Sequence, residues 1–393
     1  MKIVVTGLIA TYPLGGVGWD YLAYVSGFRR LGHDVFYLED TGQWLYDPRA
    51  GTFTDDVAFN TAYLANTLSR AGEEMQTRWS LRAPDGTYHG ASLAAVARFC
   101  SGADLFLNVS GACWLRDEYR GARRIAYLDS DPCYSQAKLL AVEQGTATED
   151  QAFSVGLIRA HDCFFTFAEN INDPSCVIPH CGLSWLPTCQ PIVLDDWPFA
   201  FTPSARAYTT VMSWKTDVTL PNLDGVAYGG KDVEFRKFID LAAHTNVHLE
   251  VALSGAAPRD ELQRHGWHVV DAYDKSRTLD SYRDYLRSSR AEWSIAKNAY
   301  VASRSGWFST RSAAYLALGK PTIVQDTGFR THYPIGNGLF AFSDMQEAAS
   351  AIDSIESNYR HNCEAARALA EDAFAAEKVL EKLLSDAGTR TIR

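Results

Sequence analysis

The sequence has no apolar run near the roughly 20 residues that a membrane helix requires. It also lacks any long run of Lys or Arg, and its formal net charge is −10. Nucleic-acid backbones are bound by clustered positive charge, so we expect neither bulk nucleic-acid binding nor a membrane span. The opening MKIVVTGLIA carries one basic residue and a short apolar stretch, which favours a buried first strand over a secretory signal. We therefore expect a cytoplasmic protein.

The eight cysteines lack the C-x-x-C spacing of zinc ribbons and redox motifs. With no export signal recognised, we expect reduced and mostly buried thiols. Cys176, His180, Cys181 and Cys189 are close enough in sequence to suggest metal ligation, but their spacing favours a packed loop. The sequence thus predicts no bound metal, and it leaves the oligomeric state open.

At 393 residues the chain exceeds the usual size of one hydrophobic core, so we expect two domains with a cleft between them. Strand and helix signals alternate in both halves, which predicts parallel sheets with helical crossovers. The predicted strands are 2–7, 34–38, 104–109, 124–128 and 163–167 in the first half, and 208–213, 247–253, 267–271, 293–295, 322–325 and 338–342 in the second.

Four prolines between residues 187 and 203 indicate a connection between domains. We predict an α/β fold in which two Rossmann-like parallel domains, 1–200 and 201–345, face a cleft. Residues 346–393 read as C-terminal helices, two in number, with a break near Tyr359.

The stretch GWFSTRSAAYLALGKP, residues 306–321, predicts a short buried helix with a polar start. Ser309 and Thr310 supply candidate capping hydroxyls, and Gly319 with Pro321 marks the exit. Arg311 adds a cation at the positive end of the helix dipole, which is unfavourable unless an anion is shared there. We interpret the arginine and the amides as a phosphate site at the carboxyl edge of the second sheet.

This segment resembles the nucleotide-sugar domain of glycosyltransferases with the two-Rossmann-domain, or GT-B, fold. Within that class it is similar to the CgeB-like branch of the group 1 glycosyl transferases, whose R-x-x-E-A-x-A-x-G-x-P pattern matches Arg311, Ala317, Gly319 and Pro321. Ala314 stands where the pattern has an acidic residue. The resemblance implies a nucleoside diphosphate sugar donor in the second domain and an acceptor in the first.

The amino-terminal segment 7–40 resembles the acceptor-domain opening of the same fold, with Gly15, Gly16 and Gly18 in a loop that faces the cleft. A dinucleotide site is the rival interpretation, because Glu39 and Asp40 end the second strand where a ribose-binding acid would lie. The glycines do not follow the G-x-G-x-x-G register, which argues against that rival.

Glycosyl transfer requires charge neutralisation on the leaving diphosphate and a base for the acceptor hydroxyl. For the base we nominate Asp131 or Asp129, which follow a strand of the first domain, with Asp20 and His180 as weaker candidates. The predicted substrate-binding residues are Gly15, Gly16, Trp214, Lys215, Lys231, Lys297, Trp307, Ser309, Thr310, Arg311, Asp326, Thr327 and Gly328.

The predicted function is therefore metal-independent transfer of a sugar from a nucleoside diphosphate sugar to a small-molecule or glycan acceptor, with no cofactor besides the donor. Two alternatives remain: an NAD-dependent oxidoreductase, and an inactive nucleotide- or sugar-binding protein with the same fold.

Overall fold

The first half of the chain builds an eight-stranded sheet with the order β10-β9-β8-β7-β1-β2-β5-β6. The computed structural model describes residues 1–215 and 228–389. In the first sheet every strand pair is parallel except β5 with β6, as β-α-β crossovers require. Its strands are β1 Lys2–Thr6, β2 Asp34–Glu39, β5 Trp79–Arg82, β6 Tyr88–Gly90, β7 Leu105–Val109, β8 Ile125–Asp129, β9 Cys163–Thr166 and β10 Trp185–Pro187.

Five α-helices accompany this sheet among the described residues: α1 Gly15–Arg30, α2 Ala58–Ser69, α3 Leu93–Ser101, α4 Tyr134–Glu143 and α5 Glu149–Arg159. A separate antiparallel pair, β3 Leu45–Asp47 with β4 Thr52–Thr54, extends from the loop after β2. Short 3-10 turns occupy Glu73–Gln76, Asp117–Tyr119 and Leu194–Asp196. We call this unit the first domain.

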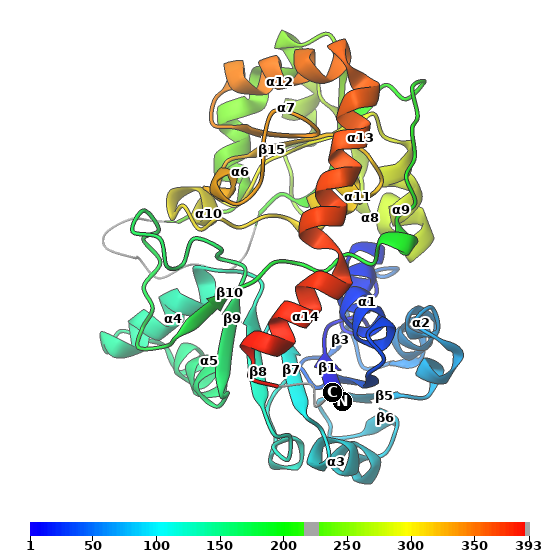
Figure 1. Ribbon diagram of the computed structural model, residues 1–393, viewed down its shortest axis with the longest axis vertical. Coiled ribbons are helices and arrows are strands. Elements are labelled where there is room, and N and C mark those ends of the chain that lie inside the picture. Colours follow the sequence, from blue (N-terminus) through cyan, green and yellow to red (C-terminus); the bar gives the residue numbers. More distant parts are fainter. Residues whose placement is uncertain (216–227, 390–393) are drawn as a thin grey trace.

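In its described residues the second domain has a six-stranded, wholly parallel sheet with the order β13-β12-β11-β14-β15-β16. Its strands are β11 Ala207–Ser213, β12 His248–Ser254, β13 His268–Asp271, β14 Ala291–Ser294, β15 Thr322–Gln325 and β16 Leu339–Phe342. Its helices are α6 Lys231–Phe235, α7 Arg259–Arg264, α8 Ala272–Ser276, α9 Leu279–Ser288, α10 Asn298–Ala302 and α11 Thr310–Ala317, with 3-10 segments at Arg236–His244 and Phe329–Thr331. The predicted fold of two Rossmann-like parallel domains is confirmed (Figure 1).

The carboxyl-terminal segment contains three α-helices in its described part, 345–389, rather than the two expected from sequence. Helices α12 Met345–Ser357 and α13 Tyr359–Leu369 meet at Asn358, next to the predicted break, and a π-helical stretch, Ala370–Phe374, follows. Helix α14, Ala376–Asp386, then crosses to the first domain and packs on α1 (Figure 1). The absence of a side chain at Gly27 allows this contact, because a β-carbon there would lie 2.5 Å from Leu380.

The glycines predicted to form a loop instead begin helix α1. Gly15 is the first residue of the helix, and a β-carbon at that position would lie 2.2 Å from the backbone oxygen of Thr278 in the second domain. At Gly16 a β-carbon would lie 3.3 Å from the Tyr282 ring. Gly15 therefore permits close packing of the two domains, a requirement that a sequence pattern does not distinguish from phosphate approach.

Contacts between the domains hold the start of α1 and the end of α2 against α9. The indole nitrogen of Trp19 donates a 2.8 Å hydrogen bond to the backbone oxygen of Leu279, and Arg70 pairs with Asp280 at 2.5 Å.

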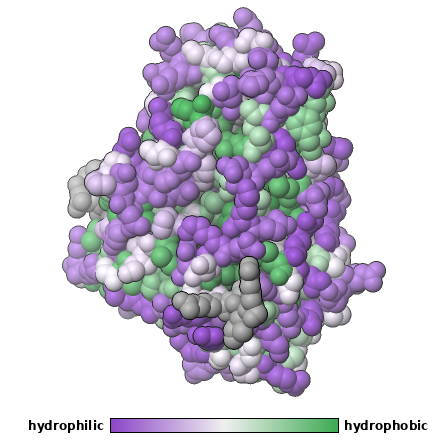
Figure 2. Space-filling view, in the orientation of Figure 1, coloured by the Kyte–Doolittle hydropathy of each residue, from purple (hydrophilic) through white to green (hydrophobic). Residues whose placement is uncertain are grey.

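On the face in Figure 2, hydrophilic residues cover most of the surface and hydrophobic residues appear in scattered patches. Among the described residues, no helix is long and apolar enough to cross a membrane.

Candidate active site

A cavity of about 420 Å³ lies between the two domains. We call it the cleft pocket. The first domain contributes the start of α1 with Leu14, Gly16, Val17 and Asp20, and the β3 region with Tyr46 and Pro48. The second domain contributes Val211, Met212 and Ser213 at the carboxyl end of β11, together with Lys231, Ser254, Ala272, Tyr273, Ser276, Tyr282 and Arg311. This is the sheet edge at which α/β proteins bind ligands.

Arg311 lies at the start of α11 and reaches the cleft pocket, but its principal partner is a carboxylate that the sequence analysis missed. Its Nε donates to Glu292 Oε1 at 2.7 Å, and its Nη1 donates to the backbone oxygen of Val211 at 2.8 Å. Glu292, on β14, is completely buried. The charge of this glutamate helps to raise the pKa of Arg311 against the opposing effect of burial. The anion that compensates the helix-start arginine is thus part of the protein.

Among the described residues, the hydrogen bonds of Arg311 leave three of its five N–H groups without a partner. A guanidinium carries five N–H groups, and two of them are used by Glu292 and Val211. The remaining three belong to a side chain that lines the cleft pocket. Arg311 can therefore be held by the protein and still donate to a ligand.

Lys231 provides a second cation in the cleft pocket, and it has neither a hydrogen bond nor an ion pair with any described residue. It is the first residue of α6 and follows Gly229 and Gly230. Burial lowers the pKa of Lys231 well below its usual value, and the nearby charges of Arg311 and Lys297 lower it further. A nearby anion raises the pKa of such an amine and favours its protonated form. Lys231 is therefore the place in the pocket best suited to phosphate.

Asp20 stands where the cleft pocket meets a second, larger cavity of about 670 Å³ in the first domain. We call the larger cavity the first-domain pocket. Asp20 has no hydrogen bond with a described residue, and its side chain is reached by solvent along the cleft. The protein around it still desolvates the carboxyl and raises its pKa to about 7, while Arg311 acts in the opposite direction. A carboxyl that titrates near neutrality is suited to general base catalysis.

The first-domain pocket combines aromatic walls with a few polar groups. Trp114 and Phe153 form an edge-to-face pair with ring centroids 5.0 Å apart, and about half of the Phe153 surface is exposed. Lys138 lines the same cavity without a described partner. Tyr12, Tyr21, Tyr127 and Tyr134 complete the aromatic lining. The cavity volume is typical of small-molecule sites.

The two aspartates predicted as bases both line the first-domain pocket, but each is engaged with the protein. Asp129 is buried and accepts hydrogen bonds from Ser135, Gln136 and Thr166 at 2.9–3.0 Å. Burial raises the pKa of Asp129 to about 6 against these hydrogen bonds. Asp131 accepts two 2.7 Å bonds from Lys297 of the second domain. This ion pair joins one predicted base to one predicted phosphate ligand and occupies both.

The other predicted substrate residues do not line the cleft pocket. Trp214 is buried in the second-domain core against Phe235, and Lys215 is exposed. Ser309 is the N-cap of α11, but its hydroxyl makes no capping hydrogen bond. Thr310 lines a cavity of about 50 Å³ together with Asp20.

Trp307, Asp326, Thr327 and Gly328 form contacts around the domain boundary. The indole of Trp307 donates to the backbone oxygen of Ser130 at 3.1 Å, and the Thr327 hydroxyl donates to the Trp307 oxygen at 2.6 Å. Asp326 accepts from the Gly328 amide and pairs with Arg330 at 2.7 Å. These polar groups are used within the protein.

The side chains of two rival sites are also accounted for. Glu39 is buried and accepts hydrogen bonds from Ala10, Thr11 and Tyr37, while Asp40 is held by Arg116 and Tyr119. Neither acid reaches the two pockets, which weakens the dinucleotide interpretation.

The proposed cysteine metal set is not assembled. Among the described residues, the group that brings three metal-ligating side chains together is His248, Glu250 and His268. The thiols of Cys181 and Cys189 instead contact the backbone oxygens of Gln136 and Ala373. Loop packing therefore explains these cysteines.

No family model matches the sequence, and no curated protein matches it. Solved structures do. An alpha-glucosyltransferase in complex with UDP superimposes with a TM-score of 0.58 at 8% identity, over 98% of this chain and 99% of that chain. HepE of Anabaena in complex with UDP gives a TM-score of 0.58 at 12% identity, over 99% and 100% of the two chains. AviGT4, a glycosyltransferase involved in avilamycin A biosynthesis, gives 0.51 at 13%, over 99% and 97%.

The chain has the GT-B fold. The likeness covers both domains and the returning C-terminal helix, and at these identities it shows the fold alone. The CgeB-like branch within the GT-B class stays a prediction. The same holds for the individual site residues.

Sequence reasoning undervalued or missed two residues at this site: Asp20, which lines the cleft pocket, and Glu292, which lies buried behind it against Arg311. Glu292 lies in the buried strand segment AEWS, where a lone acid among core residues signals a buried partner. The sequence ranks Asp20 only as a weaker candidate, because nothing in it shows that α1 places this carboxyl between two cavities.

Proposed function

We propose that this protein is a glycosyltransferase that moves a sugar from a nucleoside diphosphate sugar to a small-molecule acceptor. The observation that carries the proposal is the pair of cations, Lys231 and Arg311, in a cleft pocket that faces Asp20 and opens toward the first-domain pocket. The fold supports it, since GT-B structures similar to this chain were solved with UDP or with UDP-glucose.

The diphosphate of the donor lies against Lys231 and the free N–H groups of Arg311. As the bond between the sugar and the diphosphate breaks, negative charge grows on the leaving phosphate, and both cations stabilise it. This charge comes from side chains, so we propose that transfer needs no metal ion. Bound diphosphate also favours the protonated form of Lys231, which the free protein disfavours.

Asp20 is the general base in this proposal. The acceptor hydroxyl attacks the anomeric carbon of the sugar, its proton passes to Asp20, and the electron pair of the broken bond leaves with the nucleoside diphosphate. Asp20 lines both pockets, so it can contact an acceptor and a donor at the point where they meet. We prefer it to Asp131, whose carboxylate is neutralised by Lys297.

The acceptor occupies the first-domain pocket. Its volume of about 670 Å³ suits a small molecule, and its aromatic walls suit a ring that stacks on Trp114 or on a tyrosine. The formal net charge of −10 argues against a polyanionic acceptor.

Thermal unfolding with UDP, GDP, dTDP and NAD tests donor binding, and UDP release from UDP-glucose with a panel of hydroxylated aromatic acceptors tests transfer. We expect a diphosphate nucleotide to raise the unfolding temperature and NAD to have no effect. Stabilisation by NAD alone would refute the proposal. Nucleotide binding without turnover on any acceptor or sugar nucleotide would indicate the inactive binding protein instead.

A further inference from the structure

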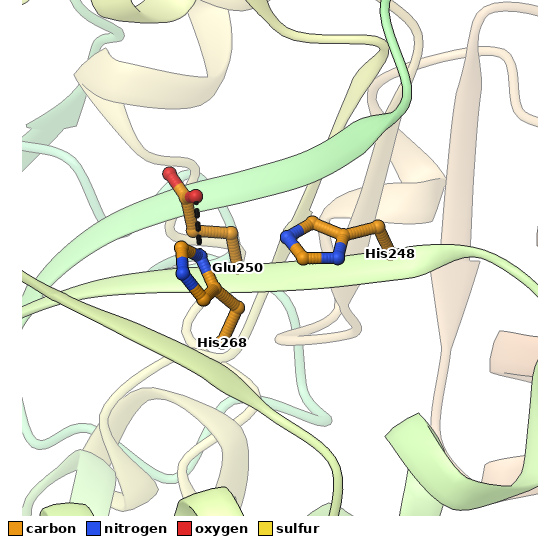
Figure 3. Close-up of side chains that lie close together, drawn as sticks. All are labelled: His248, Glu250 and His268. Atoms are coloured by element: carbon orange, nitrogen blue, oxygen red, sulfur yellow. Dashed lines mark hydrogen bonds and ion pairs between the residues drawn. The ribbon is translucent and has the colours of Figure 1, made fainter.

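Three metal-ligating side chains gather at the outer edge of the second sheet, outside both pockets. His248 and Glu250 lie two residues apart on β12, so both side chains project from the same face. Glu250 is in register with His268 on β13, the last strand of that sheet. Figure 3 shows the three side chains pointing toward one another across the two strands.

The distances within this group are close to those of a metal site. His268 Nδ1 lies 2.7 Å from Glu250 Oε2, and the two imidazole ring centroids are 4.9 Å apart. One candidate ligand atom from each residue lies within 4.8 Å of the others. Tetrahedral ligands at zinc distances are separated by about 3.3 Å, so small side-chain rotations bring these three atoms onto one ion.

A second layer of contacts holds the carboxylate. The hydroxyl of Tyr285, on α9, donates a 2.8 Å hydrogen bond to Glu250 Oε1, which leaves Oε2 directed toward His268. Among the described residues, Glu250 has no ion-pair partner apart from His268, so its charge is not neutralised by Lys or Arg. The Glu250 side chain is 14% exposed and that of His268 is 52% exposed, which combines a fixed ligand with an open path for an ion.

We propose that His248, Glu250 and His268 bind one divalent transition-metal ion of the zinc type. Two imidazoles and one carboxylate suit Zn²⁺, whereas Mg²⁺ and Ca²⁺ prefer all-oxygen sites. The site lies toward the amino ends of the strands, while the cleft pocket is lined by residues such as Ser254 at the carboxyl end of β12. The ion therefore links the edge strand β13 to β12 and takes no part in sugar transfer.

Titration calorimetry of metal-free, untagged protein with Zn²⁺ tests this proposal. We expect one site per chain, no binding of Mg²⁺, and loss of the site in His268→Ala. Tyr285→Phe keeps the ring but removes the hydrogen bond to the carboxylate, and it should weaken Zn²⁺ binding about tenfold.

His265→Ala is the matched control, because His265 also pairs with a carboxylate, Asp240, at 2.6 Å but has no third ligand within the part of the chain that the structure describes. It should leave Zn²⁺ affinity unchanged. Equal Zn²⁺ affinity in the His268→Ala and His265→Ala variants, or no Zn²⁺ binding to the parent protein, would overturn the proposal. Binding of UDP, measured on the same preparations, tests the cleft separately and is expected to be the same with and without Zn²⁺.

Discussion

Replacing Lys231 by Met separates ligand binding from folding more sharply than any other single change in the cleft. Lys231 forms no hydrogen bond or ion pair with a described residue, so its charge stabilises no contact in the part of the fold that the structure describes. A charge-assisted hydrogen bond contributes about 1.5–3 kcal/mol. Its loss should therefore weaken UDP binding about 10- to 150-fold, measured by calorimetry near pH 7.

The same substitution should not destabilise the free protein. In the folded state, burial lowers the pKa of Lys231 well below its ordinary value of 10.5. The unfolded chain therefore binds more protons at this site than the folded chain does. Protonation thus opposes folding, and the free energy of unfolding contributed by this group rises with pH between its folded and unfolded pKa values. Methionine of similar length removes both the cost and the pH dependence. We expect chemical denaturation at pH 7 to show equal or greater stability.

Lys138→Met is the matched control, because it removes from the first-domain pocket a lysine that likewise has no partner among residues 1–215 and 228–389. It should leave UDP affinity unchanged. If Lys231→Met binds UDP as tightly as the parent, Lys231 does not contact the diphosphate. If the variant loses stability together with affinity, Lys231 has a structural role instead.

Three further changes test the cleft. Asp20→Asn should abolish transfer while retaining UDP binding. In the parent protein, kcat/KM should decrease as the pH is lowered through about 7, because Asp20 becomes protonated. Unchanged turnover in the variant would show that Asp20 is not the base. Glu292→Gln should lower the free energy of unfolding by about 3 kcal/mol in urea, because it leaves Arg311 without its buried partner, whereas Glu364→Gln in an exposed pair should cost under about 1 kcal/mol. Equal effects would contradict the burial argument. Gly15→Ala should cost about 1–3 kcal/mol in the same assay, because its β-carbon meets a backbone oxygen of the other domain; a neutral result would show that the domains separate easily.

The alternation of apolar runs and helical segments in the sequence was enough to predict the two parallel sheets. Thr322–Gln325 has the predicted bounds, and the other predicted strands differ by a few residues at their ends. Such elements can be predicted locally, because the period of the apolar residues and the residue types of the turns depend on only a few neighbouring positions. The strands β3, β4, β5, β6 and β10 were missed because each has only three or four residues, too few to show a clear period. Residues 376–386 were predicted as helical, but the break before α14 and its crossing to the first domain were missed, since its partner α1 is distant in the chain.

The candidate site divides in the same way. The sequence by itself singled out Arg311 and Lys231 as candidates, because a cation at a helix start or after a pair of glycines is a local feature. Only the tertiary structure decided their surroundings: Glu292 beside one, no described partner beside the other, and Asp20 opposite both. Whether a charged side chain is neutralised, desolvated or free depends on residues from both domains that come into contact only in the folded protein. The spacing of residues in the sequence does not show which of them will do so.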